Sequence, residues 1–282
     1  MRDSFDMRSS KQLADAAPRR FRCSRGFVPG LLAALAVLVA ALSGACENPL
    51  PPEGPAPERQ IPVGPTVLLT DHSGAHGYPA WSPDGTRIAY LSSRSGDTFR
   101  PDLYVMDAAG GGETRLTSSQ AVVPGFLVWS PDGSRIAFTS RQDSDNEIYV
   151  VNANGSGVTN LTNSPGFDSS PAWSPDGSRI AFVSIREGNL ELYVMNADGS
   201  GATNLTNSAA REQGAWWSPD GSRIAFGSRR NLEVDLYVMN ADGSSATSVA
   251  LDAGLGAWSP DGRKIAFGSG LDIYLVSLYE TR

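Results

Sequence analysis

The stretch WSPDGSRIAF at residues 173–182 recurs, with few changes, at four other places in this chain. Successive copies start 48, 44, 44 and 41 residues apart. A repeat with a period in the forties is typical of solenoid and propeller proteins, in which each repeat forms one supersecondary unit. The tryptophans that open the five copies are Trp81, Trp129, Trp173, Trp217 and Trp258.

Each repeat contains four short segments with the composition of β-strands. The first ends at the tryptophan, and the Ser-Pro-Asp-Gly turn after it suits a hairpin, because proline presets one corner and glycine accepts a positive φ. In the third repeat the apolar runs 180–183 and 192–195 follow, and a turn at 196–199 leads to a last segment at 202–206. Runs that are apolar on both faces suit sheets that stack face to face. We therefore predict four-stranded antiparallel blades with the tryptophans packed between them.

The fifth repeat ends after its third strand, near Leu278. At the other end of the repeats, Thr66–Thr70 reads TVLLT and resembles the fourth-strand segment at 203–206, which reads TNLT. We predict that Thr66–Thr70 completes the last blade and closes the ring, because closure removes exposed sheet edges. The predicted fold is an all-β, five-bladed β-propeller over residues 62–282.

Residues 1–45 have the pattern of an export signal. Arginines at positions 19, 20, 22 and 25 precede an apolar run at 31–42, and small residues stand directly before Cys46. Small residues followed by cysteine resemble the lipobox of bacterial lipoproteins, although the leucine stands one position further from the cysteine, at Leu42. The resemblance implies that Cys46 is lipidated and becomes the mature N-terminus.

Two other interpretations of this segment are a plain cleaved signal and an uncleaved anchor, since about 21 residues before Glu47 carry no charge. Residues 46–61 are rich in proline and glutamate, which predicts an extended tether. Without the signal the chain has 16 basic and 27 acidic residues, a net charge of −11. This charge disfavours nucleic acid as a partner, because phosphates require a basic surface.

The unit PAWSPDGSRIAF, followed by LYVMNADG and then NLT, resembles the TolB-type, WD-repeat-like propeller repeat of exported bacterial proteins. The resemblance covers residues 66–278 and implies a monomeric scaffold in the periplasm or at the cell surface, held to the membrane only through its lipid. TolB proteins carry a six-bladed propeller behind a separate α/β domain. This chain has five repeats behind a short tether, so the resemblance does not extend to a role in the Tol–Pal system.

Motifs of catalysis are absent from the sequence. There is no Gly-x-Ser-x-Gly elbow, and the two histidines, His72 and His76, lie in a Gly/Ser-rich loop without a His-Glu-x-x-His pattern. Each Ser-Pro-Asp-Gly turn holds one carboxylate, whereas a calcium loop needs several converging oxygens. We therefore expect no metal or cofactor, and expect these aspartates to bond their own turns: Asp84, Asp132, Asp176, Asp220 and Asp261.

The loops after the second and fourth strands differ between repeats and should share one face of the propeller, opposite the two Asp-Gly turns of each blade. They combine arginine with aromatic residues, as binding hot spots do. We predict a binding face that includes Tyr78, Arg94, Phe99, Arg100, Phe126, Arg141, Asp145, Phe167, Arg186 and Arg229. The alternative is that these arginines only pair with the acids that open the third strands.

Three functions are compatible with this pattern. The first is a non-catalytic, lipid-anchored scaffold that binds another envelope protein through the loop face. The second is a propeller that binds a small ligand or a glycan in its central channel. The third is a hydrolase or a lyase, for which the sequence contains no catalytic constellation.

Overall fold

The computed structural model describes residues 65–70, 74–94, 101–118, 122–141, 145–230, 233–253 and 256–278. The chain divides into two units, Met1–Val63 and Gly64–Arg282, and the described residues all belong to the second. The predicted signal, Cys46, the whole predicted tether at 46–61 and the predicted boundaries at its two ends therefore lie outside the described residues. In the part that is described, we find no helix of a length and hydropathy suited to crossing a membrane.

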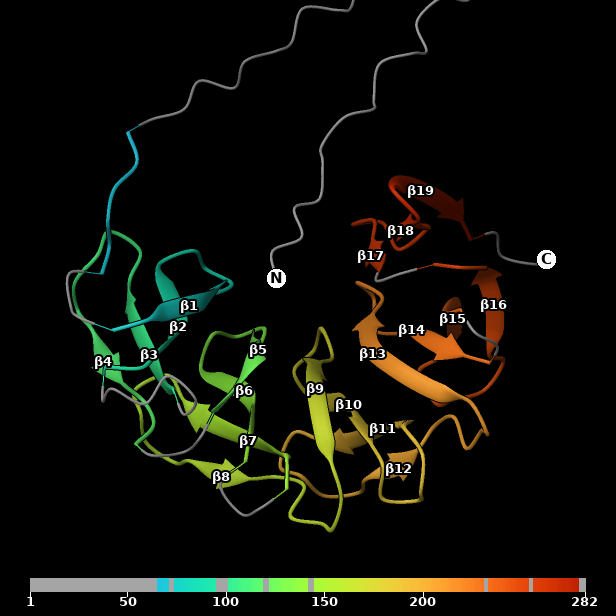
Figure 1. Cartoon of the computed structure of the whole chain (residues 1–282), viewed down its shortest axis with the longest axis horizontal. Helices are drawn as coiled ribbons and strands as arrows, with labels where there is room; N and C mark the ends of the chain where they lie inside the picture. The colour runs from blue at the N-terminus through green and yellow to red at the C-terminus, as the bar shows by residue number, and fades with distance from the viewer. Residues whose placement is uncertain are drawn as a thin grey trace, which may run out of the picture. The chain divides into compact units, whose positions relative to one another are not determined.

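The described residues form five antiparallel sheets that follow one another along the chain (Figure 1). The first contains β1 (His76–Trp81), β2 (Arg87–Ser92), β3 (Asp102–Asp107) and β4 (Thr114–Arg115). The second contains β5 (Val122–Trp129), β6 (Arg135–Ser140), β7 (Glu147–Asn152) and β8 (Thr159–Asn160). The third contains β9 (Asp168–Trp173), β10 (Arg179–Ser184), β11 (Glu191–Asn196) and β12 (Thr203–Asn204).

The fourth sheet contains β13 (Arg211–Trp217), β14 (Arg223–Arg229), β15 (Asp235–Asn240) and β16 (Thr247–Ala250). The fifth contains β17 (Gly256–Trp258), β18 (Lys264–Ser269) and β19 (Asp272–Ser277). Each sheet is one repeat, and its strands pair in sequence order. The all-β propeller architecture predicted from the repeat is confirmed.

The aspartate of each repeat organises the turn between the first two strands. In the third blade Asp176 Oδ1 accepts hydrogen bonds from Ser174 Oγ at 2.5 Å and from the Ser178 amide at 3.0 Å. These bonds hold the pKa of Asp176 at about 2, chiefly through Ser174. The Ala197 amide donates to Ser178 O at 2.9 Å, so the two Asp-Gly turns of one blade lie together on one face.

Neighbouring blades are joined by the repeated tryptophan. Trp173 Nε1 donates to the carbonyl oxygen of Val128 in the preceding blade at 3.2 Å, and the Arg135 guanidinium of that blade lies 4.8 Å from the centre of the Trp173 ring. The same indole hydrogen bond links Trp129 to Ala80, Trp217 to Ala172 and Trp258 to Trp216. The second, third and fourth repeats therefore each carry both the indole donor and the carbonyl acceptor of a blade-to-blade hydrogen bond.

The apolar core lies between the blades. Alternate residues of one strand belong to different interfaces, because strand side chains alternate between the two faces of a sheet. Ile180 and Phe182 of β10 pack toward the second blade, whereas Ala181 and Val183 pack against the fourth. This explains why the strands are apolar on both faces, as the sequence showed.

The prediction that Thr66–Thr70 supplies the fourth strand of the last blade is not met in this structure. These residues form no strand, and the sheet of β17, β18 and β19 has three strands. Leu69 instead packs against a cluster of the first blade, Ile88, Tyr90, Tyr104 and Met106, while Val67 and Leu68 are 67% and 81% exposed. The physical reason is proximity: Leu69 lies a few residues before β1, so the nearest apolar surface is that of its own first blade.

Candidate functional site

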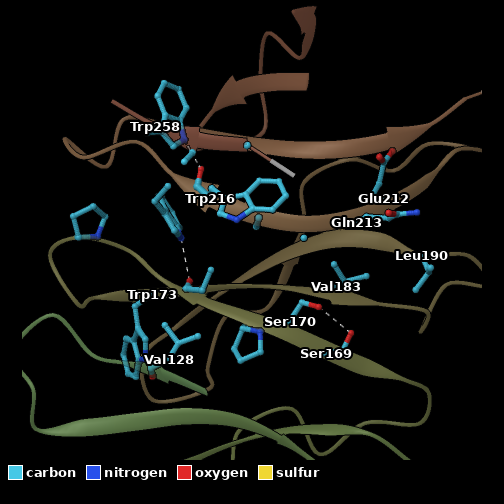
Figure 2. A pocket seen from close by; sticks show the side chains of 18 of the residues that line it. Val128, Ser169, Ser170, Trp173, Val183, Leu190, Glu212, Gln213, Trp216 and Trp258 are labelled. Atoms are coloured by element: carbon cyan, nitrogen blue, oxygen red, sulfur yellow. Dashed lines mark hydrogen bonds between the residues drawn. The ribbon is translucent and has the colours of Figure 1, made fainter. Parts of the chain in front are cut away.

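A cavity of about 790 Å³, which we call the central cavity, lies where the first strands of the third, fourth and fifth blades meet (Figure 2). Its walls come mainly from β9, β13 and β17, the first strands of those blades. The lining is predominantly apolar and aromatic, with Trp173, Trp216, Trp217 and Trp258 among its residues. Cavities of this size and composition are where proteins usually hold small molecules or anchor side chains.

The first strands reach this cavity through a β-bulge. Ser170 in β9 and Gly214 in β13 have φ of 58°, and Tyr78 in β1, at the same place in the repeat, has φ of 55°. The pairing of β13 with β14 shifts register next to Gly214, between Gln213 and Trp216. A bulge re-aims side chains locally, and a positive φ at a non-glycine residue such as Ser170 is strained. Such backbone features gather at binding sites.

Trp216 is the residue that sets this cavity apart from the rest of the repeat. The residue before the repeated tryptophan is Ala80, Val128, Ala172 or Ala257 in the other blades. The Trp216 ring lies so close to Gly214 that a Cβ there would come within 3.0 Å of it. Glycine at 214 thus admits the indole against the strand. Sequence reasoning missed Trp216, although the pair of tryptophans at 216 and 217 was a visible departure from Pro-Ala-Trp.

Glu212 is the one ionisable residue among the described residues that line the cavity. Its side chain is fully buried, and its Oε1 accepts a hydrogen bond from Ser208 Oγ at 2.8 Å. Its Oε2 is buried without a hydrogen bond to any described residue. Burial raises the pKa of Glu212, whereas the hydroxyl groups of Ser208 and Ser228 oppose the rise. The cavity therefore contains a carboxyl group with an unsatisfied oxygen.

Two arginines of the predicted binding face are engaged within the blades. The Arg94 Nη2 lies 2.5 Å from Glu113 Oε1, and its guanidinium stands 4.7 Å from the Tyr104 ring centre. The Arg186 Nη2 lies 3.1 Å from Asp168 Oδ2. Both side chains are thus held by acids of their own blades, and neither lines the cavity.

The other predicted residues of that face are scattered. Phe167 lines the cavity, Tyr78 is half-exposed on β1, and Arg229 is exposed at the end of β14. Arg141 donates from Nε to Asn146 Oδ1 at 3.0 Å, and Asp145 is exposed. Phe99, Arg100 and the side chain of Phe126 lie outside the described residues. Of the predicted residues whose side chains the structure describes, Phe167 alone lines the cavity, and the role of the whole face stays a prediction.

Four of the five acids that open the third strands, Asp102, Glu147, Glu191 and Asp235, have hydrogen-bond or ion-pair partners among the described residues of their own blades. Asp102 Oδ2 lies 2.5 Å from Arg115 Nη2 of β4, and Glu147 accepts a hydrogen bond from the Thr162 hydroxyl. Burial raises the pKa of Glu147, the Thr162 hydroxyl opposes this rise, and the Asp168 carboxylate adds to it. Arg115 and Thr162, the partners of Asp102 and Glu147, both come after the third strand of their blade. The alternative interpretation instead paired these acids with arginines of the variable loops.

No three His, Cys, Asp or Glu side chains converge as metal ligands within the residues that the structure describes. His76 belongs to the described residues, and His72 does not. The donor set of the described cavity is a single carboxyl group, which is too small to hold a divalent cation by itself.

The TolB β-propeller domain family matches residues 60–166 and 158–276. TolB from Acinetobacter baumannii is 24% identical with a TM-score of 0.60, over 72% of this chain and 52% of that one. A putative TolB from Agrobacterium tumefaciens is 22% identical with a TM-score of 0.52, over 74% and 91% of the two chains. Oligogalacturonate lyase from Vibrio parahaemolyticus is 21% identical with a TM-score of 0.60, over 74% and 66%.

These likenesses to solved structures establish the propeller fold and nothing finer. This chain spans about half the length of the Acinetobacter baumannii protein, so the activity and partners of the longer protein do not transfer with the fold. The family match extends over nearly all of the described residues and both ends of the repeat array. The chain belongs to the TolB β-propeller domain family.

Proposed function

We propose that this chain is an exported TolB-type binding protein of the cell envelope that captures a segment of another envelope protein in its central cavity and itself catalyses no reaction. The observation that carries the proposal is the cavity of about 790 Å³ into which the fourth blade adds a tryptophan that the repeat does not require. A rigid aromatic side chain in a concave, mostly apolar site is the usual anchor of a binding hot spot.

The proposed location follows from the N-terminal sequence. A signal at residues 1–45, lipid on Cys46 and a proline-rich tether at 46–61 hold the propeller near a membrane and outside the cytoplasm. An acidic domain is repelled by an anionic lipid surface, so the tether rather than the propeller makes the membrane contact. We propose that the domain works as a monomer on this tether, in the outer membrane if the cell has one.

Binding is favoured over catalysis by the composition of the cavity. A lyase or hydrolase needs a base together with a group that stabilises the charge developing in the transition state. The described lining supplies one buried carboxyl group, Glu212, and no cationic side chain. This composition favours recognition of a bound group over its chemical conversion.

Site-specific photo-crosslinking in intact cells tests the proposal. A benzophenone amino acid replaces Gln213, which lines the cavity and is exposed, and replaces Thr203 on the outer strand β12 as the matched control. We expect an adduct with one exported protein from position 213, its loss in the Trp216→Leu background, and no adduct from position 203. Equal adducts from both positions, or an adduct only from position 203, would contradict cavity capture.

A further inference from the structure

We propose that the central cavity selects a positively charged group, such as a lysine ammonium or an arginine guanidinium of the partner segment, and holds it between the Glu212 carboxylate and the tryptophan rings. The inference rests on the proposed function, because it assigns the chemistry of the group that enters the same cavity. It goes beyond that function because an aromatic cavity alone does not determine the charge of its ligand.

The ionisable side chains that line the cavity carry negative charge only, among the described residues. Among the described lining residues, Glu212 is ionisable and none is Lys, Arg or His. An anionic ligand would therefore lose its hydration without meeting a counter-charge, which is strongly unfavourable in an apolar site. A cation meets a carboxylate there, so the lining discriminates between the two signs.

The hydrogen-bonding capacity of the Glu212 carboxyl group is incompletely satisfied within the protein. Ser208 donates to Oε1 of Glu212, while Oε2 is buried without a hydrogen bond to any described residue. A buried carboxylate with a free oxygen is stabilised by a charge-assisted hydrogen bond from a cationic donor. The Glu191 carboxylate disfavours ionisation of Glu212, and the nearby Arg230 favours it.

Arg230 does not supply that missing partner in this structure. Its guanidinium lies 4.2 Å from the Tyr237 ring centre, and its Nε donates to Ser228 Oγ at 3.3 Å. Arg230 is also outside the cavity lining. Among the described residues the Ser228 hydroxyl acts on the Glu212 carboxyl without a hydrogen bond to Oε2, and no cationic side chain bonds this oxygen.

The tryptophans of the lining provide the second half of the site. Trp216 and Trp258 are only partly buried, and Trp258 Nε1 donates to Trp216 O at 2.9 Å, which fixes its ring. The face of an indole ring attracts cations more strongly than the other aromatic side chains do. This chain already uses that interaction between blades, where Arg135 lies over Trp173.

Calorimetry on the purified full chain in detergent tests the charge preference. The probes are acetyl-lysine-amide and acetyl-arginine-amide as cations, glucose as a neutral sugar and trigalacturonate as an anion. We expect saturable binding of a cation only, weakened at least about tenfold in Glu212→Gln, since a charge-assisted bond is lost. Trp216→Leu should weaken it as well. Glu187→Gln, which changes an exposed carboxylate bonded to Asn204 outside the cavity, should leave it unchanged.

The pH dependence separates a direct contact from a structural effect. Because the pKa of Glu212 is raised, cation binding by the native chain should strengthen as the pH rises above 4.5, the ordinary pKa of a glutamate, whereas Glu212→Gln should show a flat profile. Tighter binding of trigalacturonate or glucose, or equal cation binding by Glu212→Gln, would overturn the inference. If the crosslink from position 213 forms but calorimetry shows no preference for cations, only this inference is wrong. If neither the crosslink nor the cation binding is observed, the proposed function is wrong as well.

Discussion

The contact that joins consecutive blades can be tested by making one substitution at two equivalent positions. Trp173→Phe removes the indole N–H that Val128 O accepts and weakens the stacking with Arg135. Trp81→Phe makes the same chemical change in the first blade, where no blade precedes. Trp173 is 7% exposed and Trp81 is 60% exposed, so the two sites differ mainly in having a neighbour.

The expected magnitude follows from the two interactions that the substitution at Trp173 disrupts. A buried carbonyl left without its donor costs about 1–3 kcal/mol, and a cation–π interaction contributes about 0.5–1 kcal/mol. We therefore expect Trp173→Phe to lower the free energy of unfolding by about 1.5–4 kcal/mol. The change at Trp81 should stay within about 0.5 kcal/mol, as for most surface substitutions.

Urea unfolding followed by circular dichroism measures both variants, with the slope of the transition showing whether it remains a single step. Purified full chain at one low concentration is used, so that association does not contribute. An equal loss of stability at the two positions would refute the reasoning. It would mean that Trp81 is enclosed by another blade, and thus that the first and last blades meet in solution.

Three further perturbations follow from the same geometry. Since burial raises the pKa of Glu147 from its ordinary 4.5, the folded chain should lose stability as the pH rises above that value, and Glu147→Gln should flatten this trend in melting temperatures. Asp176 has its pKa lowered to about 2, so its contribution is lost as the pH falls below about 4, and Asp176→Asn should raise the midpoint pH of acid unfolding. Gly199→Ala should cost at least about 1–3 kcal/mol in urea unfolding, because its Cβ would lie 2.7 Å from Leu161 O at a φ of 89°; Gly188→Ala, also at positive φ but with open space, should cost less.

The repeat was sufficient to predict most of the fold. Ser-Pro-Asp-Gly turns, apolar runs of strand length and a fixed period determine local structure, and these are properties of neighbouring residues. The period also predicted that tryptophan fills the space between blades, as Trp173 does. The closing strand was mispredicted, because the match of Thr66–Thr70 to a fourth strand depends on where the last blade stands, which is not a local property.

The candidate site was much less predictable. The arginines of the variable loops predicted a binding surface. In the structure Arg94 and Arg186 form ion pairs with Glu113 and Asp168, which are distant in sequence, so these pairs depend on the tertiary fold. Trp216 looked like one more strand residue. Its importance appears only when Gly214 and the neighbouring blades place its ring at a cavity wall.

By itself the sequence determined that this chain builds antiparallel blades in series, since turn chemistry and strand alternation act within one repeat. Only the tertiary structure decided which residues that differ from the repeat, such as Trp216, line the cavity. It also decided whether the segment at 66–70 pairs with the last sheet. The physical reason is that a cavity is defined by the surfaces of several blades at once. Glu212 becomes a buried, unsatisfied carboxyl group only when the third blade, through Leu190 and Ser208, packs against it.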